Sequence, residues 1–358
     1  MELEGEISED IALYASCTCA NDSGIWIMNG MLPIFYFYSF DKKEITSYKV
    51  IPGCKNQQIA LFNSIFETKD ELFFIPNTHK CIVVYNKKED KFTDIRLENE
   101  CLNMFRGHMY FNGILYCIPY RSDYIIGIDV KSKRTFIESK WKEANRLENA
   151  NYINAYTIID DKIFVVVPET NCIYEYNFST HRWHVYRIGS SQNSYTYICC
   201  LGENFCVFEQ NKKELYLVDI YNDMILKQQS IDFKSVYLVN VNSEIVIVDD
   251  VESNKWIIID ADLNIIKRNT YKYRKLKRAY ASPYYFGCWF KNKNEKLYCI
   301  DCYNHLLELD KSGNETLEEL NISCDIWNES LKTNNKVNTF DIIIENDIYN
   351  LSSFIFDL

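Results

Sequence analysis

Short runs of apolar residues, separated by polar turns, follow one another along almost the whole chain. The stretch DDKIFVVVPETNCIYEYN, residues 160–177, shows the pattern: an apolar run ends at a proline, polar residues follow, and a second apolar run closes on Asn. Runs this short and rich in β-branched residues favour strands buried on both faces over core helices. Pro168 is expected to end the first strand, because proline has no N–H to donate to a sheet.

These two strands belong to a unit of four. INAYTII at 153–159 predicts a strand before them, and WHVYRI at 183–188 predicts a more polar strand after them. The template recurs, and each copy closes on an Asp or Asn, whose short side chain favours the turn into the outer strand. The closing residues are Asp41, Asn86, Asp129, Asn177, Asp219, Asp260 and Asp310, with separations of 45, 43, 48, 42, 41 and 50 residues.

The residue after the first apolar run of each unit varies. It is Pro76, Pro119, Pro168, Glu209, Asp249 or Asp301. We interpret proline as one of several stop signals at this point of the repeat.

A four-stranded unit that recurs at this interval is typical of a β-propeller. The chain therefore predicts an all-β protein, a seven-bladed propeller of four-stranded antiparallel blades in a single domain over residues 1–358. FDIIIE, residues 340–345, predicts a closing strand beside IALYASC of the first blade. Apolar residues spaced by three and four predict a short C-terminal helix over residues 347–358, with one face formed by Ile348, Leu351, Ile355 and Leu358.

The units resemble the repeats of kelch-like and related bacterial β-propellers. The segment IYEYNFSTHRW has the kelch-like spacing of tyrosine and tryptophan, and the resemblance covers nearly the whole chain. The resemblance implies the propeller fold and carries over no functional residue.

Composition and charge restrict the class of partner. The chain has 358 residues and a net charge of −11, which argues against general binding to nucleic acid or to an anionic membrane. Its start, MELEGEISED, is acidic where a secretory signal is basic, and no apolar segment follows it. We therefore expect a cytoplasmic protein.

The cysteines fit a reducing compartment. Of the 14 cysteines, most lie within apolar runs, among them Cys81, Cys117, Cys172, Cys206 and Cys299. We interpret these as small core residues with free thiols, with disulfides as the alternative.

Candidate metal ligands and catalytic groups are scattered. Cys299 and Cys302 form a CxxC, but residues three apart on a strand point to opposite faces, and no second CxxC completes four ligands. We expect no metal site and no cofactor, although His79, His108 and His305 lie in different units that a propeller could bring together. Motif patterns for a nucleophile elbow, a phosphate loop or a dinucleotide site are absent, so we assign no catalytic residue.

One basic segment differs from the rest of this acidic chain. YKYRKLKRAY, residues 271–280, contains five bases and no acid: Lys272, Arg274, Lys275, Lys277 and Arg278. The repeat register places it in the crossover between the sixth and seventh units, on the same face as the loops after the second strands. Either it is a solvated loop, or it contacts an anion or acidic partner through arginine.

Two further candidates lie on that face. Arg121 is in the loop after the second strand of the third unit, and Trp141 is in the long crossover at residues 140–152. Trp141 either packs on its own blade or forms part of a partner surface.

The sequence thus predicts a binding or scaffolding propeller that recognises a protein or anionic ligand on this face. The alternative is a propeller enzyme, a hydrolase or lyase acting on a small molecule or glycan at the central mouth. Carboxylates or histidines converging there would favour the enzyme, and a lining of Tyr, Ser and backbone would favour binding.

Overall fold

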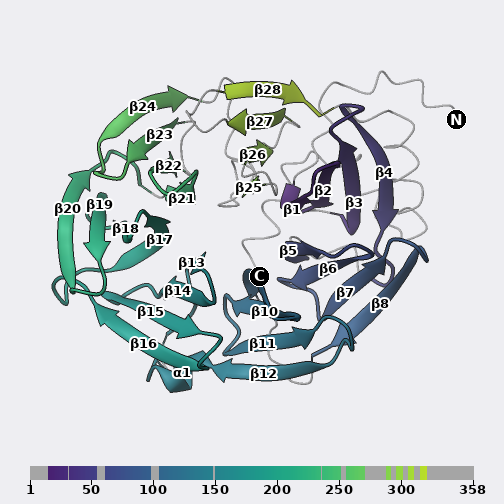
Figure 1. Cartoon of the computed structure of the whole chain (residues 1–358), viewed down its shortest axis with the longest axis horizontal. Helices are drawn as coiled ribbons and strands as arrows, with labels where there is room; N and C mark the ends of the chain where they lie inside the picture. The colour runs from purple at the N-terminus through teal and green to yellow at the C-terminus, as the bar shows by residue number, and fades with distance from the viewer. Residues whose placement is uncertain are drawn as a thin grey trace, which may run out of the picture. The chain divides into compact units, whose positions relative to one another are not determined.

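Seven four-stranded antiparallel sheets make up the molecule, which is a seven-bladed β-propeller (Figure 1). The computed structural model describes residues 15–30, 32–54, 61–97, 105–147, 150–234, 236–250, 255–270, 288–291, 296–300, 305–309 and 315–320. In each sheet the strands pair in chain order, so every blade is a simple meander. The seven blades that the sequence predicts are therefore confirmed.

The strands of the first three blades begin and end as follows. Blade 1 contains β1 (Ala15–Ala20), β2 (Gly24–Asn29), β3 (Ile34–Ser39) and β4 (Glu44–Val50). Blade 2 contains β5 (Phe62–Glu67), β6 (Glu71–Pro76), β7 (Cys81–Asn86) and β8 (Lys91–Arg96). Blade 3 contains β9 (Phe105–Phe111), β10 (Ile114–Pro119), β11 (Tyr124–Asp129) and β12 (Thr135–Lys140).

The remaining four blades repeat this arrangement. Blade 4 contains β13 (Ala155–Ile159), β14 (Lys162–Val166), β15 (Cys172–Asn177) and β16 (Arg182–Arg187). Blade 5 contains β17 (Tyr195–Leu201), β18 (Asn204–Glu209), β19 (Glu214–Asp219) and β20 (Met224–Ser230). Blade 6 contains β21 (Val236–Asn240), β22 (Ile245–Asp250), β23 (Lys255–Asp260) and β24 (Ile265–Thr270), and blade 7 contains β25 (Cys288–Lys291), β26 (Leu297–Ile300), β27 (His305–Leu309) and β28 (Glu315–Glu319).

The chain forms two compact units. One consists of Met1–Phe62 together with Lys277–Leu358, and the other is Asn63–Leu276, which holds blades 2 to 6 apart from the first residue of β5. Within the described residues the single helix is the short α1 (Trp141–Ala144). The closing strand expected at 340–345 and the helix expected at 347–358 lie outside the described residues, and the expectation of one domain stays a prediction.

Side-chain burial explains why the second and third strands of each blade are apolar throughout. β14 and β18 are buried at every position after the first, whereas the outer strand β20 alternates between exposed and half-buried residues. The buried side chains of neighbouring blades pack against each other: Phe208 and Leu217 of blade 5 share one core cluster with Val248 and Ile257 of blade 6. Each such side chain contributes about 1.5–3 kcal/mol when removed from water.

The closing Asp or Asn has the local function that the sequence indicates. In five blades it is the last residue of the third strand, and its Oδ1 accepts backbone N–H groups of the turn that follows: Asn86, Asp129, Asn177, Asp219 and Asp260. Hydrogen bonds from Asn222 and from the Ser132 turn hold the pKa of the Asp219 and Asp129 carboxyls below the usual range.

The first unit departs from this pattern. β3 ends at Ser39, and the Oγ atom of Ser39 accepts the N–H of Lys42 at 3.3 Å, so Ser39 occupies the position that we assigned to Asp41. The assignment of Asp41 was wrong by two residues, because a serine hydroxyl makes the same turn contact as a carboxylate. Asp310, the landmark of the seventh unit, lies outside the described residues.

A buried carboxylate connects blades 3 and 4. Glu138 of β12 accepts the hydroxyl of Tyr176 at 2.5 Å and contacts Nδ1 of His181 at 2.6 Å. The Glu138 side chain is 5% exposed, whereas His181 is 63% exposed in the turn after β15. We call this arrangement of one carboxylate, one tyrosine and one nitrogen-bearing side chain of the turn an interblade latch.

The smaller unit contains a second interblade latch. Glu318 of β28 in blade 7 accepts the hydroxyl of Tyr38 at 3.2 Å and pairs with Lys43 at 2.5 Å, both in blade 1. Tyr38 and Tyr176 are each the penultimate residue of a third strand, and Lys43 and His181 both have a positive φ in the turn after it. The repeat therefore reproduces a polar contact between blades as well as an apolar one.

Removing the latch carboxylate should weaken blade packing. We expect Glu138→Ala to lower the free energy of unfolding by about 2 kcal/mol, because the buried hydroxyl of Tyr176 loses its acceptor. Urea denaturation measures the change. The control is Glu143→Ala, whose side chain is 74% exposed in an ion pair with Lys140 and should change stability by about 0.5 kcal/mol or less. Equal changes in stability for the two variants would contradict the role of Glu138 in joining blades 3 and 4.

Candidate functional site

Two kinds of segment meet on one face of each blade. The meander places the loops between second and third strands on the same face as the crossovers from one blade to the next. We call this the loop-and-crossover face. It is the face that the sequence selects for binding, and its described part in blades 2 to 6 is considered below.

Arginine and tyrosine side chains converge on this face near the inner strands. The guanidinium groups of Arg106 and Arg121 each lie 5.5 Å from the centre of the Tyr120 ring, and the Tyr152 ring lies 5.3 Å from it. Tyr120 and Arg121 come from the loop after β10, Tyr152 from the crossover before β13, and Arg106 from the start of β9. We call these four residues the Arg–Tyr cluster.

The electrostatics of the Arg–Tyr cluster favour an anion. The Tyr120 ring holds the exposed guanidinium of Arg121 in place, where a carboxylate or phosphate can bind it. Arg121 is exposed, and within the described residues it forms no ion pair. Burial raises the pKa of the Tyr152 hydroxyl, with smaller contributions from Tyr120 and Tyr197, so Tyr152 stays a neutral hydrogen-bond donor.

Further tyrosines continue the surface toward blade 6. The rings of Tyr197 in β17 and Tyr237 in β21 meet edge to face at 5.3 Å, and both side chains are half-buried. Such rings offer apolar area with a polar end, which is why tyrosine is common at protein interfaces.

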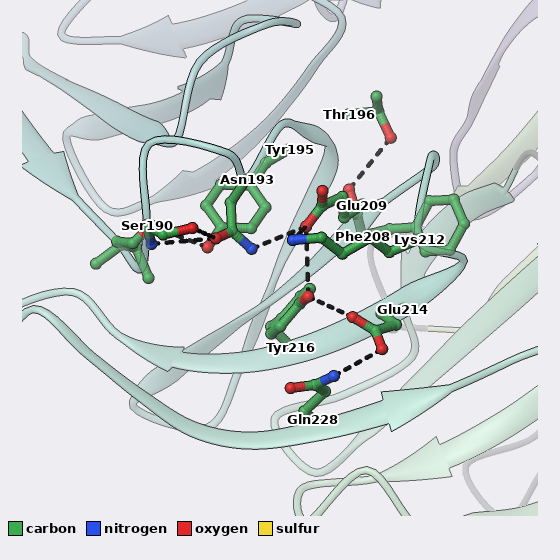
Figure 2. Close-up of polar contacts among 11 residues, drawn as sticks. Ser190, Asn193, Tyr195, Thr196, Phe208, Glu209, Lys212, Glu214, Tyr216 and Gln228 are labelled. Carbon is green, nitrogen blue, oxygen red and sulfur yellow. Dashed lines mark hydrogen bonds and ion pairs between the residues drawn. The ribbon is translucent and has the colours of Figure 1, made fainter.

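A buried carboxylate organises the same face in blade 5 (Figure 2). Oε2 of Glu209, a residue only 1% exposed, accepts Nδ2 of Asn193 at 2.8 Å and Nζ of Lys212 at 3.2 Å. Oδ1 of Asn193 in turn accepts the backbone N–H of Ser190 at 3.1 Å and its hydroxyl at 2.8 Å. Glu209 therefore ties the crossover before β17 to the loop after β18.

Tyr216 extends this network to the outer strand. Its hydroxyl lies 2.5 Å from Oε2 of Glu214 and 3.3 Å from Oε2 of Glu209, and Gln228 of β20 donates to Glu214 at 2.6 Å (Figure 2). Burial raises the pKa of Tyr216 above its usual value, followed by the hydrogen bond to Glu214. The hydroxyl has one proton, and the shorter contact assigns it to Glu214. The partners of Glu209 Oε2 fit a structural role.

Our interpretation of the strand-ending residues needs correction at two places. Glu209 and Asp250 are the last residues of β18 and β22, the position that Pro76 and Pro119 hold in β6 and β10. Glu209 and Asp249, which we expected to follow their strands, both lie within them, and Glu209, Asp249 and Asp250 are all buried. Glu209 joins loops by hydrogen bonds where proline only ends a strand.

The inner strands bring one predicted histidine to a neighbouring blade. Nδ1 of His108 in β9 lies 2.6 Å from the hydroxyl of Ser64 in β5, and the Phe66 ring meets the imidazole edge to face at 5.5 Å. Burial lowers the pKa of His108 to about 4, so the imidazole is neutral at pH 7. Within the described residues no group of three or more His, Cys, Asp or Glu side chains is arranged to hold a metal ion.

The predicted site residues have different outcomes. Arg121 lies in the Arg–Tyr cluster. Trp141 is 1% exposed and donates its indole N–H to the carbonyl of Ser122 at 2.7 Å. Of the two expectations for this residue, the structure therefore shows the one in which it packs on its own blade. The basic segment with Lys272, Arg274, Lys275, Lys277 and Arg278 lies outside the described residues.

Sequence reasoning missed Arg106, Tyr120 and Tyr152. The repeat register contained a usable signal, since Tyr120 and Tyr152 lie in the same loop and crossover as Arg121 and Trp141. What the register does not give is that the start of β9 brings Arg106 to the same ring.

The cysteines in the described part of the chain have the features of structural residues. The ten cysteines whose side chains the structure describes are free thiols, and most are buried, including Cys299. Burial raises the pKa of Cys117 and Cys199 well above the usual value, which makes both thiols poor nucleophiles. Cys302, the other half of the CxxC, lies outside the described residues. No helix in the described ranges has the length and hydrophobicity required to span a bilayer.

Comparison with known proteins shows the fold. No family model matches the chain, and no curated protein sequence matches it. The catalytically inactive virginiamycin B lyase of Staphylococcus aureus, solved with quinupristin, is similar with a TM-score of 0.62 and 12% identity, covering 84% of this chain and 95% of that chain.

Two other solved structures are similar over a comparable share of the chain. PorZ, a surface component of the type-IX secretion system of Porphyromonas gingivalis, has a TM-score of 0.57 and 11% identity over 86% of this chain, which spans 38% of the length of PorZ. The β-propeller domain of Cps50 (Swd1) from Myceliophteria thermophila has a TM-score of 0.56 and 8% identity, covering 86% and 96% of the two chains. At such identities the likeness concerns the propeller fold alone.

Loss of the buried carboxylate of blade 5 should destabilise the fold. We expect Glu209→Ala to lower the free energy of unfolding by about 3 kcal/mol, because Asn193 loses a buried acceptor and Lys212 loses its counter-charge. Gln228→Ala, at the exposed end of the same network, should change it by about 0.5 kcal/mol or less. Chemical denaturation of both variants tests this, and a Glu209 variant as stable as the Gln228 variant would refute the network's role.

The neutral state of His108 should make stability depend on pH. The ordinary histidine pKa of 6.5 is lowered to about 4 in the folded chain, so the unfolded chain binds more protons between these values. Stability from this group is therefore complete above about pH 6.5 and falls as the pH drops toward 4, by at most about 3 kcal/mol.

Urea unfolding from pH 4 to 7 measures this dependence. His108→Gln should flatten it, and His184→Gln, which changes an exposed histidine, should not. An unchanged slope in the His108 variant would show that the dependence has another source.

Proposed function

We propose that the chain is a non-catalytic binding or scaffolding propeller, which recognises a protein or anionic ligand on its loop-and-crossover face. The proposal includes a cytoplasmic location and a kelch-like, bacterial affiliation, as the sequence suggests. The observation that carries it is the Arg–Tyr cluster, in which two guanidiniums share the ring of Tyr120 on that face.

Each named residue has a distinct part in the proposal. Arg121, exposed and without an ion pair among the described residues, makes the direct contact with a carboxylate or phosphate of the partner. Tyr120 holds the guanidinium in place and offers apolar area. Trp141 acts indirectly, because its indole N–H fixes the carbonyl of Ser122 in the loop that carries Arg121. The basic segment at residues 271–280 would add long-range attraction for an acidic partner.

The enzyme alternative lacks a supporting observation. Among the described residues of the inner strands, Ser64 contacts the neutral His108, and burial raises the pKa of the Tyr156 hydroxyl. A histidine with a pKa of about 4 is a weak general base at neutral pH. Structures of similar fold include both a lyase and a secretion-system component, so the fold itself favours neither function.

Charge reversal at the cluster tests the proposal. A tagged chain is used to capture partners from a lysate of its source cell, with identification by mass spectrometry. We expect Arg121→Glu combined with Tyr120→Ala to reduce capture of the specific partner by roughly tenfold or more, since about 1.4 kcal/mol corresponds to tenfold. Arg121 is exposed, but Tyr120 is half-buried and its ring contacts Tyr152, so circular dichroism must show that the double variant is folded, and Arg121→Glu alone should leave the melting temperature nearly unchanged.

The matched control is Arg182→Glu, at an exposed arginine of the outer strand of blade 4. A second variant reverses Arg274, Lys277 and Arg278 and tests the basic segment separately. Capture at wild-type strength by both the cluster and the basic-segment variants would refute binding through this face.

A further inference from the structure

An open groove lies on the outer rim of the larger unit, away from the Arg–Tyr cluster. Its volume is about 500 Å³, and it lies between the outer strands of blades 2 and 3. It is lined by Thr93, Asp94, Ile95 and Arg96 of β8, by Lys133 and Arg134 of the turn between β11 and β12, and by Thr135, the first residue of β12. We call it the rim groove.

The charge of the rim groove is opposite to that of the chain. Three bases and one acid line it, in a protein with a net charge of −11. Arg96 and Arg134 are exposed, and neither forms an ion pair among the described residues. Lys133 is fixed by an ion pair with Glu71 and by the Phe73 ring, whose centre lies 4.3 Å from its Nζ. The two guanidiniums are therefore available to a ligand, and the lysine supports their field.

The backbone of β8 adds a second kind of recognition. β8 is the last strand of its sheet and pairs only with β7 among the described strands, so its other edge has no strand partner there. Ile95 is buried, and the neighbouring Asp94 and Arg96 are exposed, as expected for an edge strand with one face on the core. An edge of this kind accepts an added strand through main-chain hydrogen bonds.

These features together select one type of ligand. Exposed ion pairs are worth about 1 kcal/mol or less each and are screened by salt, so a small anion would bind weakly in an open groove. An extended peptide gains main-chain hydrogen bonds along β8, and carboxylates on alternate residues all face one side of such a strand. Arg96 and Arg134 suit those carboxylates because guanidinium binds them in bidentate fashion.

We propose that the rim groove binds an extended acidic segment of a partner protein, which pairs with the free edge of β8 and places its carboxylates on Arg96 and Arg134. This site is separate from the Arg–Tyr cluster and does not depend on the function proposed for it.

A labelled peptide tests this directly. The probe is a fluorescein-labelled peptide of four Glu-Thr repeats, and fluorescence anisotropy measures its binding to the full chain. We expect saturable binding, which Arg96→Glu with Arg134→Glu weakens by roughly tenfold or more. Arg96→Gln with Arg134→Gln should weaken it less, and melting temperatures confirm that both variants are folded.

Matched controls identify the site. Arg182→Glu with Arg268→Glu, which changes exposed arginines on the outer strands of blades 4 and 6, should leave the binding unchanged. Arg121→Glu should also leave peptide binding unchanged. This variant therefore separates a test of the rim groove from a test of the function proposed for the Arg–Tyr cluster. A Gln-Thr peptide should not bind.

Two results would overturn the proposal. The first is equal binding by a peptide methylated on alternate backbone nitrogens, which retains the charges but cannot pair as a strand. The second is displacement of the probe by inorganic triphosphate at micromolar concentration, which would make the groove a small-anion site. Weakened binding of the methylated peptide and no such displacement would support strand addition.

Discussion

Face-to-face packing of apolar strands from neighbouring blades is the interaction on which the rest of the molecule depends. The second and third strands of a blade are buried on both faces, so a blade cannot cover its own apolar surface and needs a neighbour on each side. Phe208 and Leu217 packing with Val248 and Ile257 is one instance. This requirement fixes the apolar runs, and it leaves the loops, crossovers and outer strands free to carry polar chemistry.

The polar groups of the described residues are arranged around this packing. Buried carboxylates serve as connectors: Glu138 latches blade 3 to blade 4, and Glu209 joins a crossover to a loop within one face. Each is surrounded by tyrosine, asparagine or a cation, as a buried charge requires. By contrast, Arg121 and Arg134 are exposed without ion pairs among the described residues. In these examples the buried acids have structural partners, and the exposed arginines are open to a ligand.

The fold could be predicted from the sequence because its signals are local and repeated. Each apolar run and closing Asp or Asn indicates a strand or turn of its own blade. Because the pattern occurs seven times, an error in placing one residue does not change the predicted fold. Asp41 shows the limit of this logic, since Ser39 makes the same turn contact with a different side chain. Glu209 shows a second limit. Its position, which proline holds in other repeats, indicates the end of a strand but does not indicate which side chains it will contact.

The candidate site could be predicted only in part, for the same reason. Arg121 was found because the register places its loop on a particular face. Its neighbours were not found, because Arg106 reaches Tyr120 through the pairing of β9 with β10, and the packing of side chains there has no signature in spacing. The rim groove lies between β8 of one blade and the turn before β12 of the next, so no single repeat contains the groove.

The most direct measurement of the central claim is hydrogen–deuterium exchange of the chain alone and in complex with its captured partner. Binding through the loop-and-crossover face predicts added protection in the loop after β10, in the crossover before β13, and in the crossover and loop joined by Glu209. The turns after the first and third strands, on the opposite face, should exchange as in the free chain. Protection confined to those opposite turns would contradict the account.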